Sequence, residues 1–201
     1  IKTGLISGSD CAIGANDDGT KLFAFFWILN GSNSEVHVLE SSDDGSTWSN
    51  ETTVISITDP PPNYSIATSG NGDLFYLHGS TSKYVARVVY SSGAWGSPVD
   101  SNANLVPYVN DYGIAAAKEA DANRYCVVVA YEDSNGDHWI VRTIYVGSTS
   151  TWGASHRDIL PIGEGNAFLQ PKYPSLCTTN EGTIVLSFSE TWTDGTNTSY
   201  S

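Results

Sequence analysis

The chain of 201 residues has no methionine, no run of 18 or more apolar residues, and only 15% charged residues. Without such a run, no membrane-spanning helix is predicted. No basic segment is followed by an apolar stretch, so no signal peptide is predicted either. Because the chain begins at Ile1 and lacks methionine, we expect a processed or excised chain rather than a complete reading frame.

Basic residues are the scarcest charged group. Nine Lys and Arg residues face 22 Asp and Glu residues, which gives a net charge of −13. A field of that sign repels the phosphates of nucleic acids and of anionic lipid surfaces. The composition therefore argues against nucleic acid as a partner.

Cysteine is also rare, at three residues, and its spacing fits no metal site. Cys11, Cys126 and Cys177 are far apart, with no CxxC pair among them. One disulfide with one cysteine left over is an alternative, but we expect three buried free thiols inside strands.

Four Asn-x-Ser/Thr sequons lie in or beside expected loops, where glycans are tolerated. The candidate glycosylation sites are Asn30, Asn50, Asn63 and Asn197. They favour a glycoprotein with an extracellular or cell-surface location.

Helical patterns are nearly absent. Short alternating apolar runs are separated by clusters of Gly, Asn, Asp and Ser, which predicts an all-β chain. The clearest expected strands are residues 21–28, 35–40, 84–90, 125–131, 138–146 and 183–189.

The order of these elements recurs along the chain. Aligning Ile13, Ile66, Ile114 and Leu176 gives spacings of 53, 48 and 62 residues. Such a period, with four strands a repeat, is typical of a β-propeller built of four-stranded antiparallel blades. We predict a single domain or fragment over 1–201, with the repeats at about 10–58, 63–106, 111–161 and 173–201.

Two further features recur with the repeat. Small residues stand where an innermost strand would be crowded, and a tryptophan follows each expected third strand. The small residues are Gly14, Ala67, Ala115 and Cys177, and the tryptophans are Trp48, Trp95 and Trp152.

The segment "SSDDGSTW" (41–48) has the spacing Ser41-x-Asp43-x-Gly45-x-Thr47-Trp48. This pattern resembles the Asp-box of the sialidase-like (BNR repeat) β-propellers. A carboxylate there can accept backbone N–H bonds of its own turn, and glycine permits positive φ. The resemblance implies a structural role for Asp43 on the face opposite the ligand-binding loops, so neither Asp43 nor Asp44 is expected to be catalytic.

The same resemblance bears on catalysis. Sialidases of this family need three clustered arginines, a tyrosine nucleophile with a glutamate partner, and an acid/base aspartate. The segment 172–190 is similar to their Arg-Ile-Pro blade, but Lys172 stands at the arginine position and cannot make a bidentate fork. Arg87 and Arg142 are expected in mid-strand, Arg124 in a turn and Arg157 beyond one, so no catalytic residue is assigned.

By the same resemblance, the ligand face consists of loops between blades and between second and third strands. Aromatic and basic residues of these expected loops are candidates for glycan binding, because aromatic faces suit sugar rings. They are Tyr64, Tyr108, Tyr112, Lys172, Tyr173 and Trp192. The alternative is that these side chains pack between adjacent blades, and for Tyr64 and Tyr112 this interpretation is at least as well supported as glycan binding.

Residues 133–137 have the alternating oxygen ligands of a calcium loop, at Asp133, Asn135 and Asp137. The later glycine and the distal glutamate of such loops are missing, and a plain hairpin turn explains the stretch equally well. No other cofactor or metal is expected.

We therefore expect an extracellular or cell-surface sialidase-like propeller that serves as a glycan-binding or surface-structural module, without an intact sialidase site. One alternative is a propeller-fold glycoside hydrolase or polysaccharide lyase completed by segments outside this chain. Another is a structural subunit of a surface filament or fibre. The expected partners are a glycan or a surface protein.

The last repeat shows only two clear strands, with a third due to begin at the final residues. An unpaired strand edge invites pairing with other chains. We expect either a larger propeller of six or seven blades or a second chain, another copy included, that supplies the missing strand.

Overall fold

The computed structural model describes residues 9–16, 18–58, 64–69, 72–78, 84–101, 108–119, 124–133, 138–146, 151–153, 156–159, 170–178, 183–193 and 198–200. The chain divides into two compact units, Ile1–Asn102 (unit 1) and Ala103–Ser201 (unit 2). Each unit is described by itself.

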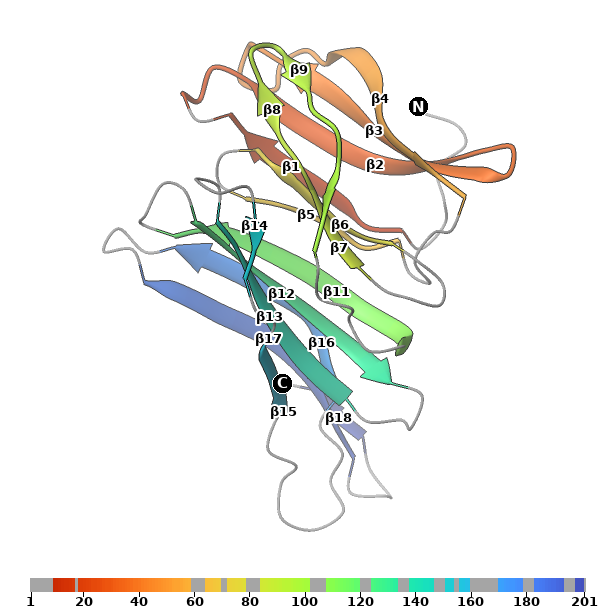
Figure 1. Cartoon of the computed structure of the whole chain (residues 1–201), viewed down its shortest axis with the longest axis vertical. Helices are drawn as coiled ribbons and strands as arrows, with labels where there is room; N and C mark the ends of the chain where they lie inside the picture. Colours follow the sequence, from red (N-terminus) through yellow and green to blue (C-terminus); the bar gives the residue numbers. More distant parts are fainter. Residues whose placement is uncertain are drawn as a thin grey trace. The chain divides into compact units, whose positions relative to one another are not determined.

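Unit 1 contains two four-stranded antiparallel sheets (Figure 1). The first is the meander β1-β2-β3-β4, with strands Cys11–Ala15, Leu22–Asn30, Asn33–Ser41 and Ser49–Ile57. The second runs β5-β6-β7-β10, with strands Ile66–Thr68, Leu74–His78, Tyr84–Val88 and Val99–Asp100. Between β7 and β10 the chain makes a small hairpin of β8 (Tyr90–Ser91) and β9 (Ala94–Trp95).

Unit 2 repeats this plan. Its first sheet has the strands β11 (Tyr108–Lys118), β12 (Arg124–Asp133) and β13 (His138–Val146). The outer edge of β13 pairs with two short strands, β14 (Thr151–Trp152) and β15 (His156–Ile159). The second sheet consists of β16 (Gln170–Thr178), β17 (Ile184–Thr193) and β18 (Thr198–Tyr200).

The all-β prediction is confirmed, since every regular element in the described residues is a strand. No helix there could cross a membrane. The third strand of the last repeat, which we expected to be missing, is present as β18 and pairs with the last residues of β17, so that expectation is wrong.

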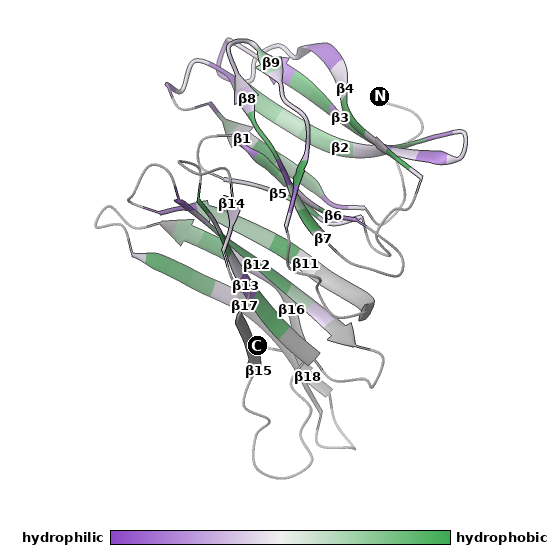
Figure 2. Cartoon of the chain, viewed as in Figure 1, coloured by the Kyte–Doolittle hydropathy of each residue, from purple (hydrophilic) through white to green (hydrophobic). Residues whose placement is uncertain are grey.

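Strand β2 shows why these sequences form half-buried strands. Phe23, Phe25 and Trp27 alternate with Ala24 and Phe26, so three large aromatic rings point to one face. That face is buried, whereas the other is only partly covered. The central strands are accordingly coloured as hydrophobic and the described hairpin turns as hydrophilic (Figure 2).

The core of unit 1 lies between its two sheets. The aromatic face of β2 and Val36 and Val38 of β3 pack against Ile66, Leu74 and Tyr76 of the second sheet. The β8–β9 hairpin covers this core, because the Trp95 ring lies 5.1 Å from Phe23 and 5.2 Å from Phe25. Edge-on aromatic contacts of this kind add stability beyond the area they bury.

The first strands of the two sheets in unit 1 approach each other closely. The Thr68 hydroxyl donates to the carbonyl oxygen of Ile13 at 2.9 Å. A Cβ added at Gly14 would lie 3.0 Å from Thr68 Oγ1 and 3.1 Å from the Cα of Gly72. The crowding expected at Gly14 is confirmed, and it explains the need for a glycine there.

In each sheet of unit 1, an ion pair joins the residue just before the second strand to a residue of the third strand, and the signs are reversed between the two sheets. In the first sheet Lys21 Nζ lies 2.7 Å from Glu40 Oε2. In the second sheet the aspartate Asp73 comes first and pairs with Arg87, and both side chains are buried. A buried pair of this kind is costly to break, because removing one partner leaves a desolvated charge.

The three cysteines are free thiols, as expected, but their predicted burial is wrong for two of them. Cys126 is buried on β12, whereas Cys11 and Cys177 are exposed on the first strands of their sheets. Strand alternation explains the difference, since Cys177 pairs with the exposed Val185 and lies on the same outward face.

Gly72→Ala should destabilise unit 1 more than the matched change Gly93→Ala. Both glycines have positive φ, at 80° and 81°, so each alanine costs about 1–2 kcal/mol in backbone strain. At Gly72 the new Cβ would also lie 2.7 Å from the carbonyl oxygen of Ala15, whereas nothing lies within 4 Å at Gly93. Chemical denaturation measures both, and equal losses of unfolding free energy would contradict the crowding of β1.

Candidate functional site

The turn between β3 and β4 is held by the side chains of the Asp-box pattern. Asp43 Oδ1 accepts hydrogen bonds from the Thr47 N–H and the Ser41 hydroxyl, both at 2.8 Å. Asp43 Oδ2 accepts one from the Thr47 hydroxyl at 2.6 Å, and the Gly45 N–H donates to Ser41 Oγ at 2.9 Å. Both carboxylate oxygens of Asp43 are therefore engaged within the turn.

The backbone of this turn explains its two central residues. Asp44 and Gly45 have φ of 57° and 83°, which aspartate tolerates and glycine adopts without strain. The Trp48 ring lies over Gly45, 3.7 Å from where a Cβ would stand, but the side chain stays 36% exposed. Trp48 thus covers one side of the turn while part of its ring stays exposed to solvent, and it is not a buried core residue.

Hydrogen bonding also sets the charge state of the turn. The bonds from Thr47 and Ser41 hold the pKa of the Asp43 carboxyl below its ordinary value. A carboxylate held ionised and fully occupied by its own turn is a poor general acid. This geometry fits a structural role for Asp43.

The other two tryptophans also follow third strands, but in turns without an aspartate. Trp95 pairs with Tyr90 in the hairpin whose turn residues Ser92 and Gly93 both have positive φ, as two-residue hairpins prefer. Trp152 is buried on β14, with its ring 5.1 Å from Tyr145. Tryptophan packing thus persists where the acidic turn does not.

Among the glycan-binding candidates, Tyr64 packs against the core of unit 1. Its ring meets Trp27 edge-on at 5.4 Å, and its φ is 54°. This is the inter-blade packing that the sequence left open as the alternative.

The remaining candidates lie in strands rather than in the expected loops. Tyr108 and Tyr112 belong to β11, Lys172 and Tyr173 to β16, and Trp192 to β17. Strands β11 and β16 are irregular near these residues. The pairing register shifts between Asp111 and Gly113 in β11 and between Lys172 and Ser175 in β16, as at a β-bulge. The side chains of these five candidates lie outside the described part of the structure.

The strand register places these candidates at one end of their sheets. Tyr108 pairs with Asp133 at the start of β11, and Lys172 pairs with Ser189 near the start of β16. In the first sheet of unit 1, the turn at residues 42–48 follows the end of β3 and so lies at the opposite end of its sheet. In the repeated meander, the Asp-box turn therefore lies at one end of the sheet, and the candidate glycan-binding residues lie at the other end.

The arginines do not form a sialidase-like cluster in the described residues. Arg87 is paired with Asp73 in unit 1, and Arg124 lies 3.2 Å from Glu119 Oε2 in unit 2. Arg124 opens β12, so its predicted place in a turn is wrong. Arg142 is exposed on β13, and Arg157 lies on β15.

Two of the sequon asparagines can be placed. Asn30 ends β2 and donates to Glu35 Oε1 at 3.2 Å, and Asn50 lies exposed on β4. Asn63 and Asn197 lie outside the described residues.

Of the possible calcium loop, Asp133 is the last residue of β12, while Asn135 and Asp137 lie outside the described residues. No group of three metal-ligating side chains is present in the part of the chain that the structure describes.

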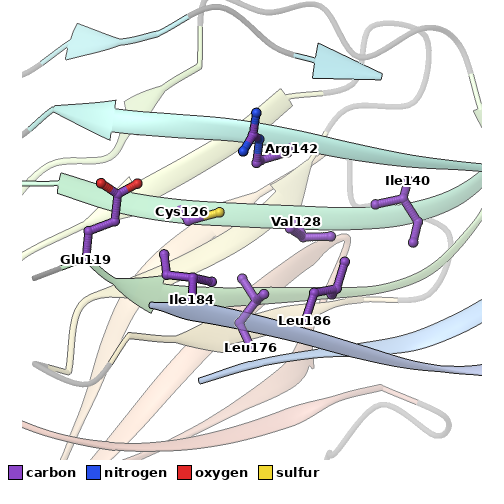
Figure 3. A pocket seen from close by; sticks show the side chains of 8 residues that line it. All are labelled: Glu119, Cys126, Val128, Ile140, Arg142, Leu176, Ile184 and Leu186. Carbon is purple, nitrogen blue, oxygen red and sulfur yellow. The ribbon is translucent and has the colours of Figure 1, made fainter. Parts of the chain in front are cut away.

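A feature that the sequence did not indicate is a cleft of about 460 Å³ in unit 2, between its two sheets (Figure 3). The first sheet contributes Cys126, Val128, Ile140 and Arg142, with Glu119 at one end. The second contributes Leu176, Ile184 and Leu186. Strand alternation could have assigned these residues to one face of each strand, but only the packed sheets reveal a space between them.

Comparisons with known proteins identify the fold alone. No protein-family model and no curated protein matches the chain. Among solved structures, the NanB sialidase of Streptococcus pneumoniae is similar with a TM-score of 0.51 and 14% identity, over 85% of this chain and 25% of that one. Hydrazine synthase of Kuenenia stuttgartiensis has a TM-score of 0.48 and 12% identity, over 90% of this chain and 63% of that one.

The chain thus spans a quarter of the sialidase's length and less than two thirds of the hydrazine synthase's. The likeness to the sialidase supports a β-propeller-like fold.

The Asp43 carboxyl should titrate below its ordinary pKa of about 3.9. Because the folded pKa is lowered, its contribution to stability is complete above the unfolded value and is lost as the pH falls through the folded one. Carboxyl NMR titration measures the pKa directly. Asp43→Ala should lower the melting temperature at pH 7, whereas Asp44→Asn, which tolerates the positive φ, should leave it unchanged.

Cys11 and Cys177 should react with iodoacetamide in the folded protein well before Cys126. Burial both shields the Cys126 thiol and raises its pKa, so less of the nucleophilic thiolate is present. Mass spectrometry over time should show two alkylations, then a third on unfolding. Three equal rates, or a rapid alkylation of the folded protein that is lost in Cys126→Ala, would contradict the assignment.

Proposed function

We propose that this chain is a β-propeller-like module that binds glycans at an extracellular or cell-surface location. Each unit consists of two successive antiparallel meanders, the plan of propeller blades. The observation that carries the proposal is that two features lie at opposite ends of the meander. The Asp-box turn uses its own polar groups at one end, and the candidates Tyr108, Tyr173 and Trp192 lie toward the other end of their sheets.

A sialidase reaction by this chain's own residues has little support. Arg87 pairs with a carboxylate of unit 1, and Arg124 pairs with a carboxylate of unit 2. The carboxylate of Asp43 accepts hydrogen bonds from its own turn. The likeness to a sialidase concerns the fold. Binding, rather than hydrolysis, is the function that this arrangement favours.

The kind of glycan follows from charge. A net charge of −13 disfavours strongly acidic polysaccharides through long-range repulsion. Tyrosine and tryptophan faces, with Lys172 as a single cation, suit neutral or mildly charged sugars.

Glycan arrays should show binding of neutral or mildly charged glycans. Tyr108→Ala and Tyr173→Ala should each weaken it about tenfold, as truncation of an aromatic anchor does. Trp48→Ala is the matched control, because this exposed ring lies at the other end of its sheet and should leave affinity unchanged. Circular dichroism checks that each variant keeps the native fold, and isothermal titration calorimetry then gives its affinity.

Silence on the arrays together with specific binding to a protein would overturn the glycan proposal in favour of adhesion or assembly. Cleavage of an arrayed glycan would instead establish the hydrolase or lyase alternative.

A further inference from the structure

Three titratable side chains meet on the first sheet of unit 1, on the face that does not form the core. They are Glu35 and His37 of β3 and Glu51 of β4, and we call them the Glu–His–Glu cluster. His37 Nε2 lies 2.9 Å from Glu35 Oε2, and His37 Nδ1 lies 2.7 Å from Glu51 Oε1. Because β4 is the edge strand of the sheet, the imidazole links an inner strand to the edge.

The cluster is largely shielded from solvent. The side chains of Glu35, His37 and Glu51 are 11%, 15% and 32% exposed. The ring of Phe26 on β2 lies 6.2 Å from the His37 ring, and Phe26 pairs with Cys11 of β1. The strand register therefore adds one further titratable group to this face of the described sheet, the Cys11 thiol. Charges attract each other more strongly in such a setting than in open solvent.

The hydrogen bonds to Glu35 fix its charge state. Its Oε1 accepts hydrogen bonds from Asn30 Nδ2 and from the Ser56 hydroxyl, both at 3.2 Å. The bond from His37, together with these two, holds the pKa of the Glu35 carboxyl below its ordinary value. An ionised carboxylate only accepts hydrogen bonds, so His37 Nε2 must carry a hydrogen.

The contact on the other side of the ring needs a second hydrogen. A neutral imidazole carries hydrogen on one nitrogen only, and that hydrogen is already used at Nε2. The Nδ1 lone pair would then face the lone pairs of Glu51 Oε1 across 2.7 Å. The Thr53 hydroxyl lies 3.2 Å from Nε2 and supplies nothing to Nδ1. The observed geometry thus holds one proton more than a neutral histidine between two carboxylates.

Strand β4 has an irregular backbone ladder where this link is made. Its pairing with β3 shifts register between Val36 and His37, and again between Val38 and Glu40. Each shift interrupts the ladder of backbone hydrogen bonds. The side-chain link through His37 therefore lies where the backbone holds β4 least evenly.

We propose that the Glu–His–Glu cluster is a proton-dependent clasp that fastens the edge strand β4 to β3. With the proton in place, the imidazolium donates to both carboxylates and ties the two strands together. When the proton leaves, the Nδ1 lone pair and the Glu51 carboxylate repel each other, and β4 loosens. The clasp is independent of the proposed glycan site.

The direction of the pH dependence follows from the two kinds of group. A proton held more tightly by the folded protein contributes stability that is complete at low pH and is lost as the pH rises. The Glu35 carboxyl has a lowered pKa, so its contribution is lost only as the pH falls through its folded value. The clasp is closed between these limits and opens toward alkaline pH.

Side-chain ¹⁵N NMR of the whole protein tests the proton directly. At pH 7 both ring nitrogens of His37 should carry hydrogen. In Glu51→Gln, the glutamine amide can donate to the Nδ1 lone pair, so His37 should carry hydrogen on Nε2 alone.

Amide hydrogen exchange, expressed as protection factors, tests the effect on β4. Between pH 6 and pH 9 the β4 amides should lose about two- to fivefold in protection, as expected for breaking a partly exposed ion pair. His37→Gln should show the weaker protection at both pH values, and Glu51→Gln the stronger. His78→Gln is the matched control, because His78 contacts Asp100 in the other sheet of unit 1 and its loss should leave the β4 change intact.

Three results would overturn the proposal. One is a neutral His37 at pH 7 in the unchanged protein. Another is constant β4 protection from pH 6 to pH 9, or the same loss in Glu51→Gln as in the unchanged protein. The third is an equal loss in the amides of β2, which would report general unfolding rather than release of the edge strand.

Discussion

The first sheet of unit 1 has one strongly apolar face, and this face must be covered by something other than its own strands. In unit 1 the cover is the second sheet with its aromatic hairpin, which together bury the row Phe23, Phe25 and Trp27. A four-stranded meander cannot shield this row by itself. The close approach of β1 and β5 at Gly14 follows from it, because the sheets must come near enough for the rings to interlock.

Much of this architecture could be predicted from local patterns. Alternation identified the central strands, such as β13 over 138–146, and the repeat placed a tryptophan after each third strand. The box residues were recognisable because their hydrogen bonds are all local, between positions 41 and 47. Features decided within a few residues leave a signature that one sequence can show.

The failures have the opposite character. Tyr112 and Tyr173 were expected in loops because bulged strand starts look irregular in sequence. The exposure of Cys177 depends on which face of β16 is covered, and the cleft beside Arg142 depends on how two sheets meet. These properties belong to pairs of distant segments, for which a single sequence holds no pattern.

The reversed ion pairs of unit 1 have a consequence for folding. Its two meanders are alike enough that a strand of one could align with a strand of the other. Pairing β2 with β7 would set Lys21 beside Arg87, and pairing β6 with β3 would set Asp73 beside Glu40. Like charges brought together destabilise neighbouring strands. The opposite polarity of the two ion pairs therefore disfavours the pairing of a strand from one repeat with a strand from the other.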